Sequence, residues 1–309
     1  MAHWVGLGTA PLGSSPDGPL WWGPQSWDDA VGTVVAAVAA GVAFIDTAPF
    51  YGWGRAEQIV GEAVAEISAP VPVYTKCGTM RSADGTVVED AGRDAVRADV
   101  EASLTRLGLE RLDVVQVHDP DPQVPIEETW EALMGLRDEG LIAAAGLSNH
   151  DPATMERASR VGSVAVVQHQ YSLLHRRPED DGVLNWCLRH DAAFLAWAPL
   201  ASGFLTDGFD LAALHTDDLR HGLRWAGRDA AVTANVRAAL REIADERSST
   251  MTHVALSWLR RHDAVQPIVG ARSPQEAGQL ATPPLALSDD ELARLGEAAA
   301  RPDESARRG

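Results

Sequence analysis

Four residues with ionisable side chains stand at related positions in the N-terminal part of the chain. Asp46, Lys76 and His118 each end a short apolar, β-branched run, and Tyr51 follows Asp46 by five residues. The parallel strands of an α/β barrel all end at the same mouth, and enzymes with this fold build their active sites there. The pattern therefore predicts an enzyme in which a carboxylate, an ammonium, an imidazole and a phenol meet at one mouth.

These side chains suit the protonation of an alkoxide, which forms when a hydride adds to a carbonyl group. A tyrosine, whose pKa is about 10 in water, can donate that proton if a neighbouring cation eases its ionisation. We expect Tyr51 to be this acid, Lys76 to lower its pKa, and Asp46 to keep Lys76 charged and oriented. His118 would donate a hydrogen bond to the carbonyl oxygen.

Each residue also has an ordinary alternative role. Asp46 or Lys76 alone could form a surface ion pair. Tyr51 could pack as a loop aromatic, and His118 could cap the loop that follows it. Four matching residue types at related positions favour the catalytic interpretation over these separate ones.

Strand-like and helix-like patterns alternate along the chain, which predicts βα units and a (β/α)8 TIM barrel with one additional C-terminal helix. Two connections, residues 14–27 and 200–229, are longer than a barrel requires, and long loops at the C-terminal face usually carry function. The predicted strands are residues 4–8, 42–46, 71–75, 112–117, 143–147, 165–168, 193–197 and 265–269. The predicted helices are residues 28–40, 56–67, 93–107, 125–139, 152–160, 179–190, 231–261 and 289–300, with a further helix start at Ser273.

The composition indicates one domain without nucleic-acid or membrane partners. A chain of 309 residues with 45% apolar content can bury a large core, so we expect one domain over residues 1–300 and a flexible polar tail over 301–309. The net charge of -18 disfavours nucleic acid and anionic membranes, and no run approaches the roughly 18 apolar residues of a membrane span. Cys77 and Cys187 predict neither a disulfide framework nor a metal site, and a cytoplasmic location fits them.

Six segments in the same order resemble aldo-keto reductases across almost the whole chain: residues 44–52, 74–78, 115–118, 146–149, 168–174 and 197–203. The resemblance is strongest to bacterial members that reduce aldehydes or oxidise sugars at C1. It implies an NAD(P)H-dependent oxidoreductase, NADP(H) being preferred and NAD(H) possible, that acts as a monomer on a carbonyl or sugar substrate. It also places the catalytic residues at Asp46, Tyr51, Lys76 and His118.

The same resemblance implies where the cofactor binds, since the chain has no Gly-x-Gly-x-x-Gly turn after its first strand. The nicotinamide would lie against Trp197, and Arg272 would meet a 2′-phosphate. As alternatives, Trp197 could belong to the barrel core and Arg272 could be a solvated arginine. The predicted cofactor residues are Gly8, Thr9, Asp46, Ser148, Asn149, Gln168, Trp197, Leu200, Ser202, Gly203, Leu205, Gly270, Ala271, Arg272, Glu276 and Gln279.

Two departures from relatives bear on these expectations. Many relatives hold adenine with a Glu-Asn pair where this chain has Gln279-Leu280, so the choice between NADPH and NADH stays open. Relatives usually begin with a hairpin that closes the bottom of the barrel, and residues 1–3 leave almost no room for one.

The substrate site is expected to be aromatic, which suits a small aldehyde, an aldose or a larger ketone. A nicotinamide-binding regulator with little turnover is the alternative function. A barrel isomerase or lyase is a third possibility, but it would leave Trp197 and Gln168 without a purpose. The predicted substrate residues are Trp22, Phe50, Tyr51, Trp53, His118 and Trp225.

Overall fold

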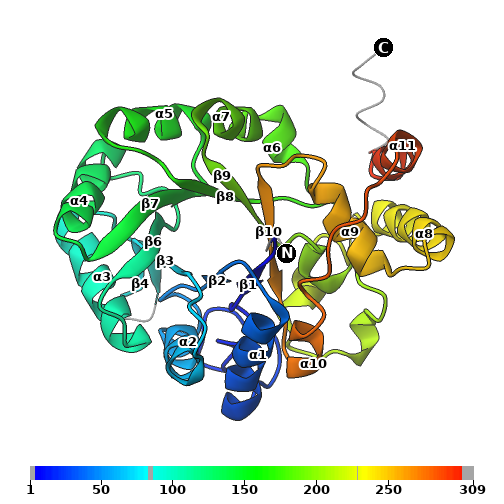
Figure 1. The fold of residues 1–309 in the computed structure, drawn as a ribbon, viewed down its shortest axis with the longest axis horizontal. Coiled ribbons are helices and arrows are strands. Elements are labelled where there is room, and N and C mark those ends of the chain that lie inside the picture. The colour runs from blue at the N-terminus through cyan, green and yellow to red at the C-terminus, as the bar shows by residue number, and fades with distance from the viewer. Residues whose placement is uncertain (1–3, 83–85, 228, 301–309) are drawn as a thin grey trace.

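Eight parallel strands close into a barrel in the order β1, β10, β9, β8, β7, β6, β3, β2, with helices around the outside (Figure 1). The structure is a computed structural model that describes residues 4–82, 86–227 and 229–300, so residues 1–3 and the predicted tail at 301–309 lie outside it. The predicted (β/α)8 barrel is confirmed. The barrel strands are β1 (Gly6–Gly8), β2 (Ile45–Asp46), β3 (Val73–Cys77), β6 (Leu112–Val117), β7 (Ile142–Ser148), β8 (Val166–Gln170), β9 (Ala193–Trp197) and β10 (Val265–Gly270).

The helices lie close to their predicted positions. Two predictions were wrong, because the structure has two consecutive helices where one long helix was predicted. Residues 179–190 divide at Gly182, whose φ of 87° is left-handed, and residues 231–261 divide at a turn that contains Ser248, with a φ of 49°. Left-handed residues end a helix because they turn the chain away from its axis. The helices are α1 (Trp27–Ala40), α2 (Arg55–Glu66), α3 (Arg93–Leu107), α4 (Ile126–Asp138), α5 (Pro152–Val161), α6 (Arg177–Asp180), α7 (Val183–His190), α8 (Ala230–Glu246), α9 (Met251–Leu259), α10 (Pro274–Ala277) and α11 (Asp289–Ala298).

One pair of strands was not predicted. β4 (Thr79–Arg81) and β5 (Val87–Glu89) form an antiparallel hairpin directly after β3. The predicted helix start near the C-terminal end is confirmed, since the Ser273 hydroxyl accepts the backbone N–H of Glu276 at 3.2 Å. The long loop at 200–229 contains the short 3₁₀ turns η1 (Ala201–Gly203), η2 (Leu211–Ala213) and η3 (Leu219–Gly222).

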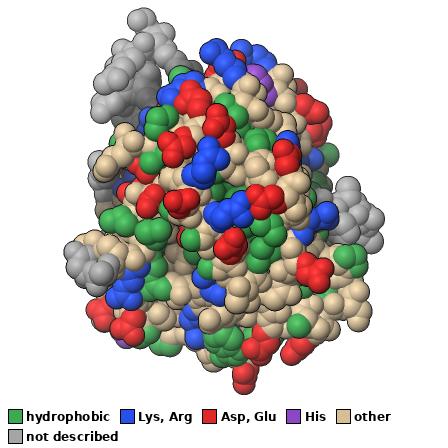
Figure 2. All heavy atoms as spheres, turned by 90° about the vertical axis from the view of Figure 1, so that its left-hand side faces the viewer, with side chains coloured by type: hydrophobic (Ala, Val, Ile, Leu, Met, Phe, Trp, Pro, Cys, Tyr) green, Lys and Arg blue, Asp and Glu red, His purple; other side chains and the backbone are tan. Residues whose placement is uncertain are grey.

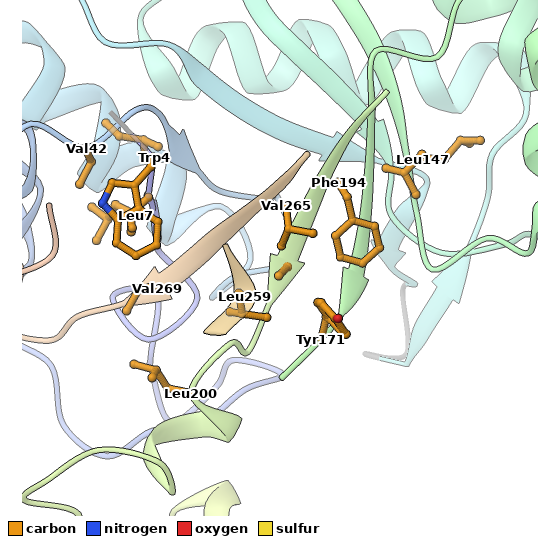
Figure 3. Packing of buried hydrophobic residues seen from close by; sticks show 14 of the residues in the cluster. Trp4, Leu7, Val42, Leu147, Tyr171, Phe194, Leu200, Leu259, Val265 and Val269 are labelled. Carbon is orange, nitrogen blue, oxygen red and sulfur yellow. The ribbon is translucent and has the colours of Figure 1, made fainter. Parts of the chain in front are cut away.

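Strand side chains alternate between the helix layer and the barrel interior, as the two-residue period of a strand requires. Phe194, Val265 and Val269 belong to the larger hydrophobic core, which also contains Leu200 from the long loop and Leu259 from α9 (Figure 3). This core joins the strands to the helices and loops, so it holds the strand ends in fixed positions.

Inside the barrel, the residues change from apolar to polar toward the mouth. The deep layer is apolar, and within it Phe44 stacks on Tyr74 with 4.5 Å between ring centroids. At β2, β3, β6 and β8, the residue two positions further along the chain places a polar side chain on the same face. Asp46, Lys76, Gln116 and Gln168 follow Phe44, Tyr74, Val114 and Val166 in this way.

Charged side chains of both signs cover the side of the molecule that carries α3 and α4 (Figure 2). Arg97 of α3 pairs with Glu139 just after α4, and Arg93 pairs with Glu131 at 3.1 Å. Exposed pairs of this kind each contribute only about 0–1 kcal/mol to stability.

Three observations concern the predicted absence of membrane spans, metal and disulfides. Among the residues that the structure describes, no helix is long and apolar enough to cross a membrane. The same residues contain no cluster of three or more His, Cys, Asp or Glu side chains suited to a metal ion. Cys77 and Cys187 are both buried as free thiols.

Candidate active site

The Lys76 ammonium lies at the centre of a buried group of acceptors. Its Nζ is 2.7 Å from Asp46 Oδ1, 3.0 Å from the carbonyl oxygen of Thr47 and 3.1 Å from the Tyr51 hydroxyl. Lys76 and Asp46 are only 1% and 2% exposed. A buried ion pair is maintained only when its remaining hydrogen-bonding groups are satisfied, and here both charges have such partners.

Close backbone contacts hold Tyr51 in place after β2. The backbone N–H and the hydroxyl of Thr9 both donate to the carbonyl oxygen of Asp46, each at 3.0 Å, which ties β1 to the end of β2. Gly52 has a φ of 65°, and a Cβ there would lie 2.1 Å from the carbonyl oxygen of Gly13. Only glycine fits that contact, so the turn that carries Tyr51 is fixed against the loop after β1.

The pKa values of the pair favour a protonated lysine and a protonated tyrosine. Burial alone would lower the pKa of Lys76, but Asp46 and Tyr51 outweigh it and the pKa is raised. Burial raises the pKa of Tyr51, and Lys76 opposes this effect without overcoming it. The expectation that Lys76 lowers the pKa of Tyr51 thus holds for its own contribution, while desolvation decides the net direction.

His118 lies beside the tyrosine as a neutral imidazole. Its ring meets those of Tyr51 and Phe50 edge-on, with 5.9 and 5.6 Å between centroids. Burial, followed by the charge of Lys76, holds the pKa of His118 well below its usual range. A neutral imidazole keeps one N–H, so it can still donate to an oxygen between itself and Tyr51.

The second carboxylate oxygen of Asp46 binds two side-chain amides. Gln168 Nε2 lies 2.8 Å and Gln116 Nε2 lies 3.2 Å from Asp46 Oδ2, and Gln168 Nε2 also donates to Gln116 Oε1 at 3.1 Å. Gln116 was not among the predicted site residues. The signal for it was its place two residues before His118, because that spacing in an extended segment points both side chains to the same, inward side, Gln116 from β6 and His118 from the residue directly after it.

Asn149 connects the loop after β6 to the tryptophan at the end of β9. Trp197 Nε1 donates to Asn149 Oδ1 at 3.1 Å, and Asn149 Nδ2 donates to Asp119 Oδ1 at 2.9 Å. These bonds use both ends of the Asn149 amide and fix the plane of the Trp197 indole. Burial raises the pKa of Asp119.

A cavity of about 1340 Å³ opens at the mouth of the barrel and contains most of the predicted site. Tyr51, His118 and Trp197 line it, whereas Lys76 lies behind Tyr51. The structure brings the remaining predicted cofactor and substrate residues to the same cavity, with four exceptions that do not line it. These are Thr9, Trp53, Leu205 and Ala271.

The roof of this cavity is formed by the two long loops. The guanidinium of Arg272 donates to the carbonyl oxygens of Trp22, Gly23 (3.2 Å) and Pro24 (2.6 Å), and to the side chain of Gln25 (3.2 Å). The residue predicted to meet a 2′-phosphate is thus bound to the loop at 14–27. Burial and then the charge of Arg220 lower the pKa of Arg272.

The two loops also contact each other across the cavity. The backbone N–H of Leu219 donates to the carbonyl oxygen of Trp21 at 2.9 Å. Arg220 lies over the ring of Trp22 at 5.4 Å and pairs with Asp218 at 2.7 Å. A ligand in the cavity would therefore lie beneath the loops at 14–27 and 200–229, which are joined to each other by this hydrogen bond.

The floor of the cavity suits a flat ring that carries an amide. Trp197 presents a partly exposed indole to the cavity, and the amide of Gln168 and the hydroxyl of Ser148 line the same space. An aromatic face with a few fixed polar groups is the usual form of such a site. The residues present therefore fit a nicotinamide ring next to Tyr51.

Comparisons with known proteins agree with this geometry. The model of the Aldo/keto reductase family matches residues 5–300. The NADH-specific methylglyoxal reductase of Escherichia coli (strain K12) is 29% identical over 315 residues, which cover 96% of this chain and 94% of the relative. The solved glycerol dehydrogenase AKR11B4 from Gluconobacter oxydans has a TM-score of 0.86 at 30% identity and covers 95% of this chain and 90% of its own. An aldo-keto reductase from Klebsiella pneumoniae in complex with NADPH has a TM-score of 0.71 at 28% identity, covering 95% and 89%.

Proposed function

Because the chain belongs to the aldo/keto reductase family, we propose that it is an NAD(P)H-dependent oxidoreductase in which Tyr51 protonates the oxygen of an aldehyde or ketone. The contact between the Tyr51 hydroxyl and Lys76 Nζ, at 3.1 Å, carries this proposal. It places a cation where a phenolate would form, and a general acid needs that stabilisation in order to release its proton.

In the proposed reaction, each of the four residues at the mouth of the barrel has its own role. A bound nicotinamide cofactor supplies or accepts the hydride. Tyr51 gives its phenolic proton to the carbonyl oxygen, Lys76 stabilises the phenolate that is left, and Asp46 holds Lys76 in place. The neutral imidazole of His118 donates to the same oxygen and orients it. In the direction of alcohol oxidation, the same groups take the proton back.

A cofactor with or without the 2′-phosphate is compatible with the comparisons. The Klebsiella pneumoniae structure is a complex with NADPH, and the Escherichia coli relative is named as NADH-specific. We propose NADP(H) as the preferred cofactor and NAD(H) as a second one. The residues expected to hold it are those of the cavity floor, with Trp197 under the ring.

Aromatic side chains near the reacting centre restrict the substrate. Phe50 contacts His118 and also meets Trp53 edge-on, with 5.5 Å between ring centroids. Trp22 and Trp225 line the same cavity. The two named relatives act on methylglyoxal and glycerol, both small polar molecules. We therefore propose a small aldehyde, ketone or sugar as substrate.

Replacing Tyr51 by Phe tests the assignment of the acid. The variant keeps the ring and loses the proton donor, so turnover should fall by a factor of about 10² to 10⁴ while cofactor affinity stays the same. Tryptophan fluorescence measures binding of NADPH and NADH, and absorbance of the reduced cofactor measures turnover with a panel of aldehydes and sugars. Full activity in Tyr51→Phe would remove Tyr51 from this role. Cofactor binding without turnover in the unmodified protein would favour a regulator instead.

A further inference from the structure

Gln116 lies inside the barrel, behind the cavity, and its hydrogen-bond partner Gln168 lines that cavity. Its side chain is completely buried and does not reach the cavity, whereas Gln168 does. Gln116 Nε2 donates to Asp46 Oδ2 at 3.2 Å, and Gln116 Oε1 accepts an N–H of Gln168 at 3.1 Å. It is thus bound both to the carboxylate that holds Lys76 and to an amide on the cavity floor.

These bonds determine which end of the Gln168 amide faces the cavity. A carboxylate only accepts hydrogen bonds, so both glutamines must turn their nitrogen toward Asp46. Gln168 Nε2 has two hydrogens, and Asp46 and Gln116 take them at 2.8 and 3.1 Å. The oxygen of Gln168 is then the polar atom left for a ligand.

The sheet leaves room for Gln116 at one specific position. Gly146 of β7 is the direct partner of Gln116 in the sheet, and of Val166 on its other side. A Cβ at Gly146 would lie 3.0 Å from Gln116 Cγ and 2.4 Å from Val166 Cγ2. The missing side chain allows the long glutamine to turn inward and reach the centre of the barrel.

We propose that Gln116 is a positioning residue that fixes the Gln168 amide so that its oxygen accepts the amide N–H of the nicotinamide carboxamide. This rests on the proposed use of a nicotinamide cofactor. Without Gln116, the hydrogen bonds among the described residues would leave the Gln168 amide nitrogen held by Asp46 alone, and the side chain would swing about that single bond. Gln116 therefore supplies a second hydrogen bond to the Gln168 amide, and the two bonds together fix the direction in which the Gln168 oxygen points.

Two cofactors that differ only in that N–H test the proposal. The 3-acetylpyridine analogue of NADPH keeps the carbonyl group and replaces the amide nitrogen by a methyl group. The unmodified protein should bind NADPH about tenfold more tightly than the analogue, the ratio expected for one directional hydrogen bond. In Gln116→Met the ratio should fall below about threefold, with binding followed by tryptophan fluorescence.

Two further variants distinguish the hydrogen bond from Gln168 to residue 116 from a general effect of altered packing inside the barrel. Gln116→Glu keeps an oxygen that accepts from Gln168. Two buried carboxylates that share a site keep one proton between them, so the Glu–Asp46 pair also keeps a hydrogen bond, and the variant should retain most of the tenfold ratio. Val114→Ala alters the same inward face of β6 one step deeper and should leave the ratio unchanged. An unaltered ratio in Gln116→Met, or a lost ratio in Gln116→Glu, would overturn the proposal. If Gln116→Met does not fold, the ratio in Gln116→Glu decides.

The same titrations distinguish failure of this inference from failure of the proposed function. If the unmodified protein binds neither NADPH nor NADH, both are overturned. If it binds NADPH and turns over a carbonyl substrate while Gln116→Met discriminates like the unmodified protein, only the role of Gln116 is lost.

Discussion

The floor and the roof of the cavity are built by opposite means. The floor consists of side chains from barrel strands, and its charges are buried and paired at 2.7 to 3.2 Å. The roof consists of two long loops that hold each other through Arg272 and the contact between Leu219 and Trp21. The difference indicates that the groups proposed to transfer the proton depend on the rigidity of the sheet, whereas the enclosure above them depends on hydrogen bonds between loops.

Breaking the floor should have the largest effect. Lys76→Met removes the cation beside Tyr51 and leaves Asp46 as an unpaired buried charge. We expect turnover to fall about a thousandfold and the free energy of unfolding to fall by about 3–5 kcal/mol. Steady-state kinetics and urea unfolding measure the two effects.

The double variant with Asp46→Asn and Lys76→Met is the matched control. It removes both charges, so stability should recover while turnover stays low. A stable, active single variant would contradict the view that this ion pair supports the chemistry.

Acidification should destabilise the region directly behind the floor. His150 is buried with Nδ1 2.6 Å from the carbonyl oxygen of Ser148, and burial lowers its pKa to about 4. In the unfolded chain the pKa of His150 would be about 6.5, so below that pH the unfolded state binds more protons than the folded state. Stability should therefore fall as the pH drops from about 6.5 toward 4, by up to about 3 kcal/mol.

The comparison with His150→Asn isolates this contribution. Asp99, whose pKa is raised to about 6 by burial, acts in the opposite sense over a similar range. Urea unfolding at pH 7.5 and 4.5 should show a smaller loss in the variant than in the unmodified protein. Equal losses would mean that His150 does not titrate on unfolding.

Loosening the roof should have the smallest effect, and this effect should be on the affinity for the cofactor. Arg272→Met removes the donors that hold the loop at 14–27, so affinity for NADPH and NADH should fall together by about tenfold. A fall confined to NADPH would instead assign Arg272 to the 2′-phosphate. Fluorescence titration measures both, and Arg111→Met, an exposed arginine just before β6, is the control.

Sequence patterns predicted the floor better than the roof, for a physical reason. Strand period and apolar runs predicted β6 and β9 with the observed bounds, and the ends of β2 and β3 bring Asp46 and Lys76 together as expected. Gln116 was missed because only the strand ends were considered, although its spacing from His118 contained the information.

The partners of Arg272 could not be predicted in the same way. They lie 247 to 250 residues away in a loop without periodicity, so nothing local in the sequence indicates them. The hairpin of β4 and β5 was missed because each strand has only three residues, too few for an alternating pattern.

The contact between Gly13 and Gly52 limits how this protein can evolve. Because any side chain at Gly52 would meet the carbonyl oxygen of Gly13, the loops after β1 and β2 cannot change independently at that point. Selection for a new substrate would have to act elsewhere on the mouth. The loop at 200–229, many of whose residues line the cavity, is the segment where directed evolution can diversify specificity without disturbing Tyr51.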